Sequence, residues 1–131
     1  IGLMYDAIRQ EKMDEALRLM QTFLSTVPYA DNTHYEGHYQ QVLYILFSLF
    51  GMYVDVEVRT PNGRVDVVMQ TKSTLYLIEL KLNKSAEAAM AQIDLKDYPS
   101  RFALSGLPIV KVGINFDGER HTLKDWLIER M

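Results

Sequence analysis

Hydrophobic positions near the start of the chain recur at helical spacing, with charged residues between them. Over residues 4–24 the apolar residues lie mostly three or four positions apart, which favours one amphipathic helix. Pro28 and the polar residues 31–33 interrupt this pattern. A second helical pattern runs from about Thr33 to Leu49, and its later half is so apolar that we expect it to be buried.

An alternation of apolar and charged residues begins after this helix and is typical of strands. Residues 54–58 alternate with period two, which predicts a half-buried strand. The Pro-Asn-Gly sequence at 61–63 has the residues of a hairpin turn. Two further strands are expected over residues 64–70 and 74–82. The second of these is apolar on both faces, so we expect it at the centre of the sheet.

The last third of the chain predicts one helix and two strands. Ser85 is a suitable N-cap for a helix that continues to about residue 104. Residues 109–116 form a strand, and residues 120–128 form a final strand or strand-like tail. A helix between two strands acts as a crossover that makes them parallel. The expected fold is therefore α/β, with a mixed central sheet flanked by helices.

Length and composition agree with one folded domain. The 131 residues are 48% hydrophobic and 24% charged, which excludes wholesale disorder. There is no internal repeat or linker, so residues 1–131 are expected to form a single domain. Because the chain begins at Ile1 directly in helical sequence, we interpret it as a fragment of a longer protein.

Cysteine usage and hydropathy indicate the compartment. The absence of cysteine excludes disulfides and thiolate metal sites, and we expect a cytoplasmic protein. No apolar stretch reaches the roughly 18 residues of a membrane span, so no membrane partner is expected. The net charge of −3 argues mildly against a nucleic-acid partner. A site that gathers carboxylates around a divalent ion also lowers the charge of the protein, so nucleic acid stays possible.

Three charged residues fall within the apolar strands and are the strongest chemical signal. Asp66 lies on the second expected strand, and Glu79 and Lys81 share one face of the third. Two carboxylates and one ammonium do not neutralise each other, and burial of each charge is costly. A divalent cation with hard oxygen ligands, Mg²⁺ or Mn²⁺, would complete the balance. A structural ion pair between Lys81 and either acid is the alternative.

These residues resemble the catalytic motif of the PD-(D/E)xK nuclease superfamily, which includes many restriction endonucleases. The resemblance extends to one subgroup, in which the domain follows an AAA-type ATPase-like domain in bacterial proteins. It is carried by residues 59–60, 63–66, 76–81, 85–87, 91–93 and 111–116 and by Trp126. One departure is Val65, where the superfamily motif has proline.

The resemblance implies a restriction-endonuclease-like core that hydrolyses DNA or RNA. Asp66 and Glu79 would bind Mg²⁺ or Mn²⁺, and Lys81 would act in catalysis. An ATPase-like domain would lie upstream in the full-length chain. A non-catalytic module that binds nucleic acid or a partner protein is the alternative function. The intact Asp66, Glu79 and Lys81 favour the nuclease.

Several further residues are candidates for the site, each with an ordinary structural explanation beside it. The resemblance gives Glu36 a catalytic role, although Glu36 also completes a capping box with Thr33. Gln40, one helical turn further, can support the site and is a candidate for binding nucleic acid. Gln92 resembles a polar position that contacts the site in relatives, or lies on a solvated helix face. Tyr98 can stack on nucleic acid or belong to the core or rim.

Basic residues are scattered over the second half of the chain and could form a weak rim for a phosphate backbone. Surface solvation is the alternative for all of them. They are Lys72, Lys84, Lys96, Arg101 and Lys111, of which Lys84 follows the expected catalytic strand most closely. His34 and His38 are four residues apart, but no glutamate-flanked zinc signature surrounds them, so we do not expect a zinc site.

Overall fold

The computed structural model of the chain describes residues 2–26, 36–50, 52–60, 63–95 and 106–131. Within these ranges the chain forms four helices and five strands. In chain order they are α1 (Gly2–Arg9), α2 (Met13–Ser25), α3 (Glu36–Leu49), β1 (Tyr53–Thr60), β2 (Gly63–Gln70), β3 (Leu75–Leu82), α4 (Ala86–Leu95), β4 (Ile109–Asp117) and β5 (Thr122–Arg130).

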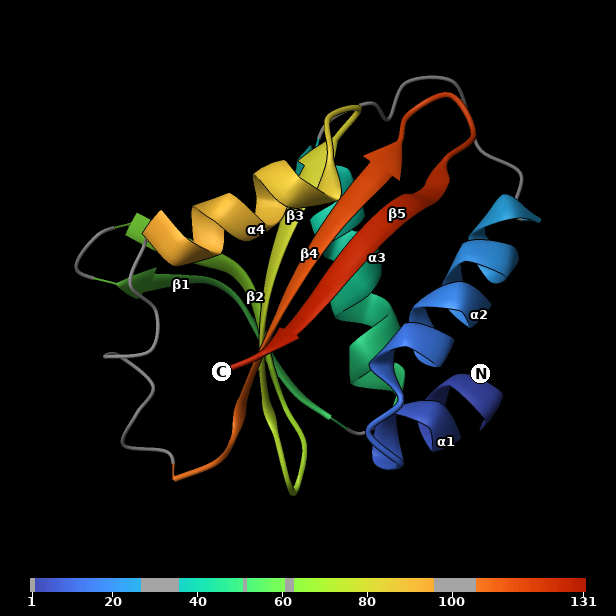
Figure 1. Cartoon of the computed structure of the whole chain (residues 1–131). Helices are drawn as coiled ribbons and strands as arrows, with labels where there is room; N and C mark the ends of the chain where they lie inside the picture. Colours follow the sequence, from blue (N-terminus) through green and yellow to red (C-terminus); the bar gives the residue numbers. More distant parts are fainter. Residues whose placement is uncertain (1, 27–35, 51, 61–62, 96–105) are drawn as a thin grey trace.

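The five strands form one mixed sheet in the order β1-β2-β3-β4-β5 (Figure 1). β3 is therefore central, as its two apolar faces predict. β3 and β4 are parallel, and the other neighbouring strands are antiparallel. α4 connects the two parallel strands as the expected crossover. The α/β fold with a mixed sheet flanked by helices is confirmed, and it agrees with a restriction-endonuclease-like core.

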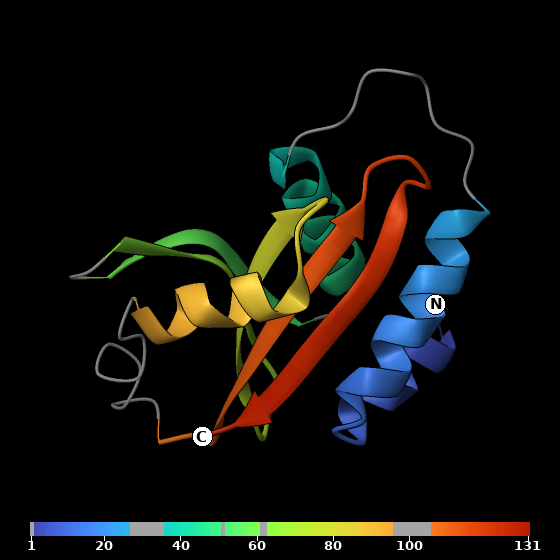
Figure 2. The same cartoon turned by 45° about the horizontal axis from the view of Figure 1, so that its top comes forward.

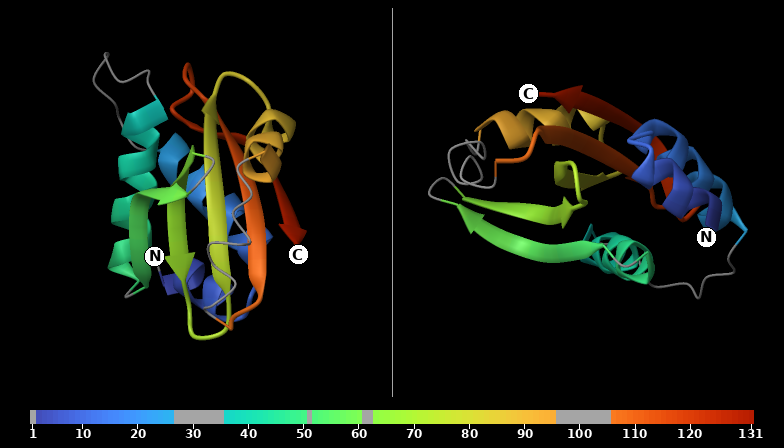
Figure 3. Two further views of the ribbon diagram at one scale, coloured as in Figure 1. Left: turned by 90° about the vertical axis from the view of Figure 1, so that its left-hand side faces the viewer. Right: turned by 90° about the horizontal axis from the view of Figure 1, so that it is seen from below.

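Helices cover both faces of the sheet (Figure 3). α1, α2 and α3 contribute to a large core on one face, and α4 packs over a smaller core on the other. Successive residues of β3 alternate between the two cores. Ile78 and Leu80 belong to the large core, and Leu75 and Leu77 belong to the small one. This alternation explains why β3 is apolar at nearly every position.

The N-terminal segment forms two helices, and the prediction of one continuous helix over residues 4–24 is wrong. Glu11, between α1 and α2, adopts a left-handed backbone conformation with a φ of 60°. Its carboxylate accepts hydrogen bonds from the hydroxyls of Thr74 at 2.5 Å and Ser73 at 3.2 Å. Both hydrogen bonds lower the pKa of Glu11, and the bond from Thr74 has the larger effect. The break thus coincides with contacts to the β2–β3 turn, which local periodicity cannot reveal.

The prediction that the later half of α3 is buried is only partly right. Leu43 and Phe47 are fully buried, whereas Ile45 is 58% and Leu49 is 62% exposed. α3 packs on one face of the sheet, so the opposite side of the helix points away from the core. No helix in the described part of the chain is long and apolar enough to cross a membrane.

α4 begins with the predicted cap and lies very close to β4. The Ser85 hydroxyl accepts a hydrogen bond from the Ala88 amide at 3.0 Å, which confirms Ser85 as the N-cap. A Cβ atom at Gly113 would lie 2.9 Å from both the Ala86 carbonyl oxygen and the Met90 nitrogen. The close contact between α4 and β4 therefore requires a residue without a side chain at position 113.

The β1–β2 hairpin bends at its middle. Glu57 has a φ of 54°, a conformation that few residues other than glycine adopt. Val56 and Val67 pack against the large core, whereas Val58 and Val65, beyond the bend, pack in the small core with α4. Figure 2 shows the hairpin curving past α4. The bend therefore brings the outer half of the hairpin to the α4 side of the sheet.

Candidate active site

β2 and β3 part at the place where two of the candidate residues lie. The last pair in their ladder is Val67 with Ile78. Beyond this pair, β2 continues beside β1, and β3 continues beside β4. Asp66 and Glu79 are the next residues on the two strands. Strands that part leave backbone groups without ladder partners, so side chains, water or ligands have to satisfy them.

The Asp66 carboxylate satisfies one of these groups. Its Oδ2 accepts a hydrogen bond from the Leu80 amide at 2.9 Å, so it bridges β2 and β3 beyond the end of their ladder. Gln40 of α3 donates a hydrogen bond from Nε2 to the Asp66 carbonyl oxygen at 2.7 Å. Asp66 is half-buried. Its side chain and its backbone are therefore both held in place.

Glu79 and Lys81 lie on the face of β3 that α4 covers. They alternate with Ile78 and Leu80, which belong to the large core on the other face. Lys81 is half-buried, and Glu79 is only 2% exposed. Glu79 is the register partner of Gly113, where α4 makes its close approach. A carboxylate this deeply covered is costly unless hydrogen bonds or a cation compensate its charge.

The donor atoms of Asp66 and Glu79 suit a hard divalent cation. Both residues offer carboxylate oxygens, which Mg²⁺ and Mn²⁺ prefer. Among the described residues, no group of three or more His, Cys, Asp or Glu side chains gathers in one place. Mg²⁺ commonly uses one or two protein carboxylates and fills its other positions with water and substrate oxygens. A site with these two carboxylates as ligands would therefore be an open one, with positions left for water and substrate.

The candidates on α3 lie at the start of that helix. Glu36 is its first residue, and its side chain lies outside the described part of the structure, as does Thr33, its expected capping partner. Gln40 follows one helical turn later. The hydrogen bond from Gln40 to Asp66 links α3 to the strand that carries the candidate acid.

The nucleic-acid-binding candidates differ in their placement. Gln92 is half-buried on α4. Asp94 on the same helix bonds Lys111 of β4, and Gln92 lies roughly 160° around the helix from Asp94. Gln92 therefore lies on a different side of α4 from this contact with β4. Lys84 is exposed after the end of β3. Tyr98 falls in residues 96–105, outside the described ranges, together with the expected end of the helix.

Lys111 does not belong to a basic rim, which corrects the prediction from the sequence. It is 8% exposed, and its ammonium bonds Asp94 at 2.6 Å and Glu129 at 3.2 Å. The hydrogen bond to Asp94 is the main reason that the pKa of Lys111 is raised. Lys111 thus ties α4 to β4 and β5. The other rim residues are Lys72 and Lys84, which are exposed, and Lys96 and Arg101, which lie outside the described ranges.

Asn115 is a buried polar residue beside the candidate site that the motifs did not single out. It is 1% exposed and is the register partner of Lys81. Its Oδ1 accepts a hydrogen bond from the Lys84 amide at 2.9 Å, and its Nδ2 donates one to the Lys84 carbonyl oxygen at 3.2 Å. It thereby fixes the segment between Lys81 and α4. The signal in the sequence is a lone amide in an apolar strand, because such a group needs partners.

Replacing Asn115 with alanine is expected to destabilise the domain by about 1–3 kcal/mol, because both backbone groups of Lys84 lose a buried partner. Urea unfolding followed by circular dichroism measures the change. Ser25→Ala is the control, since the exposed Ser25 donates one hydrogen bond, to the Thr22 carbonyl oxygen, and its loss should cost less. Equal stability of the Asn115 variant and the unmodified protein would contradict the role.

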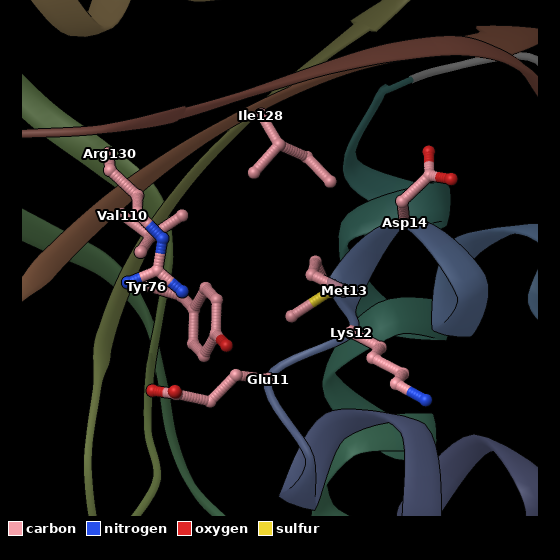
Figure 4. A pocket seen from close by; sticks show the side chains of 8 residues that line it. All are labelled: Glu11, Lys12, Met13, Asp14, Tyr76, Val110, Ile128 and Arg130. Atoms are coloured by element: carbon pink, nitrogen blue, oxygen red, sulfur yellow. The ribbon is translucent and has the colours of Figure 1, made fainter.

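A pocket of about 240 Å³ lies at the opposite end of the sheet from Lys81. Figure 4 shows Arg130 and Tyr76 together on one wall, with the ammonium of Lys12 directed away from them. Burial raises the pKa of Tyr76, and the negative charge of Glu11 raises it further. Because the pocket lies at the start of β3, it is separate from the cluster around Asp66.

The α/β fold and the placement of Asp66, Glu79 and Lys81 around the end of the β2–β3 ladder are both compatible with a nuclease-type domain. The model of the PD-(D/E)XK nuclease superfamily matches residues 34–126, and the chain belongs to this superfamily. The resemblance of the motifs is thus confirmed at the level of the superfamily.

A curated relative extends the similarity over nearly the whole chain. It is a protein of Azotobacter chroococcum mcd 1 named "Uncharacterized protein in vnfD 5'region". The two are 28% identical over an alignment of 137 positions that covers 99% of this chain. The chain spans 27% of the length of that relative.

Proposed function

We propose that this chain is a metal-dependent nuclease domain that hydrolyses phosphodiester bonds in DNA or RNA. The observation that carries the proposal is the opening between β2 and β3, where Asp66 bridges the strands and Glu79 and Lys81 follow on β3. Membership of the superfamily supports the same class of reaction.

The proposed roles follow from the chemistry of the three side chains. Asp66 and Glu79 hold Mg²⁺ or Mn²⁺. When bound, such an ion polarises a phosphodiester oxygen and offsets charge on the phosphate. The Lys81 ammonium donates hydrogen bonds to the attacking water and to the phosphate as negative charge develops. The water oxygen bonds to phosphorus as the ester P–O bond breaks, the leaving oxygen takes up a proton, and the water proton passes to solvent.

The surrounding residues have supporting roles in this proposal. Glu36 adds a third carboxylate, and Gln40 holds the backbone of Asp66. Gln92, Lys84 and Tyr98 contact the nucleic acid. A lysine in such a position binds phosphate and adds affinity without sequence preference.

The proposal extends to the longer protein. The chain spans 27% of its curated relative, which leaves room for other domains in proteins of this kind. We infer that the domain follows an AAA-type ATPase-like domain in a bacterial cytoplasmic protein. In that arrangement the ATPase part would govern when the nuclease meets its substrate.

Cleavage assays test the proposed activity. Supercoiled plasmid, single-stranded DNA and single-stranded RNA are incubated with the protein and either Mg²⁺ or Mn²⁺, with EDTA as the control. We expect cleavage of at least one substrate that EDTA abolishes. Cleavage that persists in EDTA would reject a metal-dependent mechanism. The absence of cleavage of every substrate would favour a non-catalytic binding module.

A further inference from the structure

A pocket of about 780 Å³ lies among α1, the end of α3, the start of β1 and the turn between β2 and β3. This volume is in the range of sites that hold small organic ligands, roughly 300–1,000 Å³. Its wall includes three aromatic residues, Tyr5, Phe50 and Tyr53, and two cationic ones, Arg9 and Lys72. The lysine and Tyr53 are at the far end of the sheet from Lys81, so this pocket is distinct from the candidate active site.

The aromatic residues give the pocket one rigid wall and one exposed ring. Tyr5 and Phe50 lie with their ring centres 6.4 Å apart, and the Arg9 guanidinium lies 5.6 Å from the centre of the Tyr5 ring. Tyr53 is 65% exposed. An exposed tyrosine beside a pocket offers a flat apolar surface on which another aromatic ring can stack.

The charge of the pocket is positive. None of its lining residues is acidic. Arg9 and Lys72 form no ion pair with another residue in the described part of the chain. The Glu11 carboxylate, which bonds the lining residue Ser73, offsets part of this charge, and the two cations still leave an excess of positive charge. Two cations that form no ion pair among the described residues favour an anionic ligand.

We propose that this pocket binds a nucleotide unit, either free or within a single strand. The base stacks on Tyr53, and the phosphate pairs with Arg9 and Lys72. Stacking on aromatic side chains next to cations is the usual basis of sequence-tolerant binding of single strands. Gln70, the register partner of Tyr53, lies four residues along β2 from Asp66, roughly 14 Å away. The inference does not rest on the proposed nuclease activity.

Binding measurements in EDTA test the pocket without cleavage. The probes are AMP, followed by calorimetry, and fluorescein-labelled oligo(dT), followed by fluorescence anisotropy. We expect Tyr53→Ala and the double variant Arg9→Glu/Lys72→Glu each to weaken binding roughly 5- to 100-fold. Tyr44→Ala and Lys124→Glu, at exposed positions outside the pocket, are matched controls that should leave the affinity within about twofold. Thermal unfolding of each variant verifies that it is folded.

The outcomes distinguish a free nucleotide from a nucleotide within a strand. They also distinguish the proposal for this pocket from the proposal for the nuclease site. Binding of AMP supports a site for free nucleotides, whereas binding of oligo(dT) alone supports a site for a strand. Inorganic phosphate that binds as tightly as AMP, or affinity that survives the pocket variants, overturns the proposal. Binding of neither probe at millimolar concentration also overturns it and would leave the pocket to a protein partner. The Asp66→Asn variant should still bind these probes in the pocket. Its binding therefore distinguishes a failure of the pocket proposal from a failure of the proposed active site.

Discussion

Replacing Lys81 with methionine is expected to lower the rate of Mg²⁺-dependent cleavage by at least about 100-fold. Methionine keeps an unbranched apolar side chain in this half-buried position and removes only the charge and the hydrogen-bond donors. The loss follows because no ammonium remains to orient the water and to stabilise the phosphate in the transition state. Single-turnover cleavage of a labelled substrate measures the chemical step directly.

Metal binding provides the internal check on the Lys81 variant. Lys81→Met should bind Mn²⁺ at least as well as the unmodified protein, because a nearby positive charge is removed. Lys124→Met on β5 is a matched control, since this exposed lysine lies outside the candidate site. A Lys81 variant that cleaves at the unmodified rate would rule out its catalytic role and leave it as a structural charge.

Replacing Asp66 with asparagine is expected to weaken Mn²⁺ binding by more than about 100-fold, and to abolish cleavage with it. Loss of a residue that only supports a metal ligand commonly costs 10- to 100-fold in affinity, so loss of a ligand should exceed this. The asparagine oxygen can still accept the hydrogen bond from the Leu80 amide. The variant therefore removes the charge and keeps the bridge between β2 and β3. Calorimetric titration with Mn²⁺ measures the change.

Asp66→Ala separates the structural contribution of this residue from its charge. It removes the acceptor as well, so it should also destabilise the domain by about 1 kcal/mol relative to Asp66→Asn. Asp125→Asn on β5 is the control for the loss of one negative charge at an exposed position. Unchanged Mn²⁺ affinity in both Asp66 variants would show that Asp66 is not a metal ligand.

The succession of strands and the central place of β3 could be predicted because their signals are local. Alternation in β1, the turn residues before β2 and the two apolar faces of β3 each depend on neighbouring residues, and the crossover rule then sets β4 parallel to β3. The break at Glu11 could not be predicted in this way. Its backbone conformation accompanies hydrogen bonds to Thr74, which is 63 residues away in the chain.

The candidate site was predictable as a set of residues but not as a geometry. The spacing of Glu79 and Lys81 places them on one face of any strand. That β2 and β3 part beside Asp66, and that its carboxylate then bonds the Leu80 amide, depends on how the whole sheet bends. The burial of Lys111 could not be predicted either, because its partner Asp94 comes from the crossover helix and is not part of the motif.

The bend in the β1–β2 hairpin also affects how separate molecules meet. β1 is the outermost strand on one side of the sheet, and a flat outer strand can recruit another chain by β pairing. Here Asp55 accepts a hydrogen bond from the Val56 amide, and the left-handed Glu57 twists the strand out of plane. The exposed charged side chains of Asp55, Glu57 and Arg59 would lose hydration if another strand paired here, which adds a further cost. The β1 edge of the sheet is therefore expected to resist fibril-like aggregation even when the protein is concentrated.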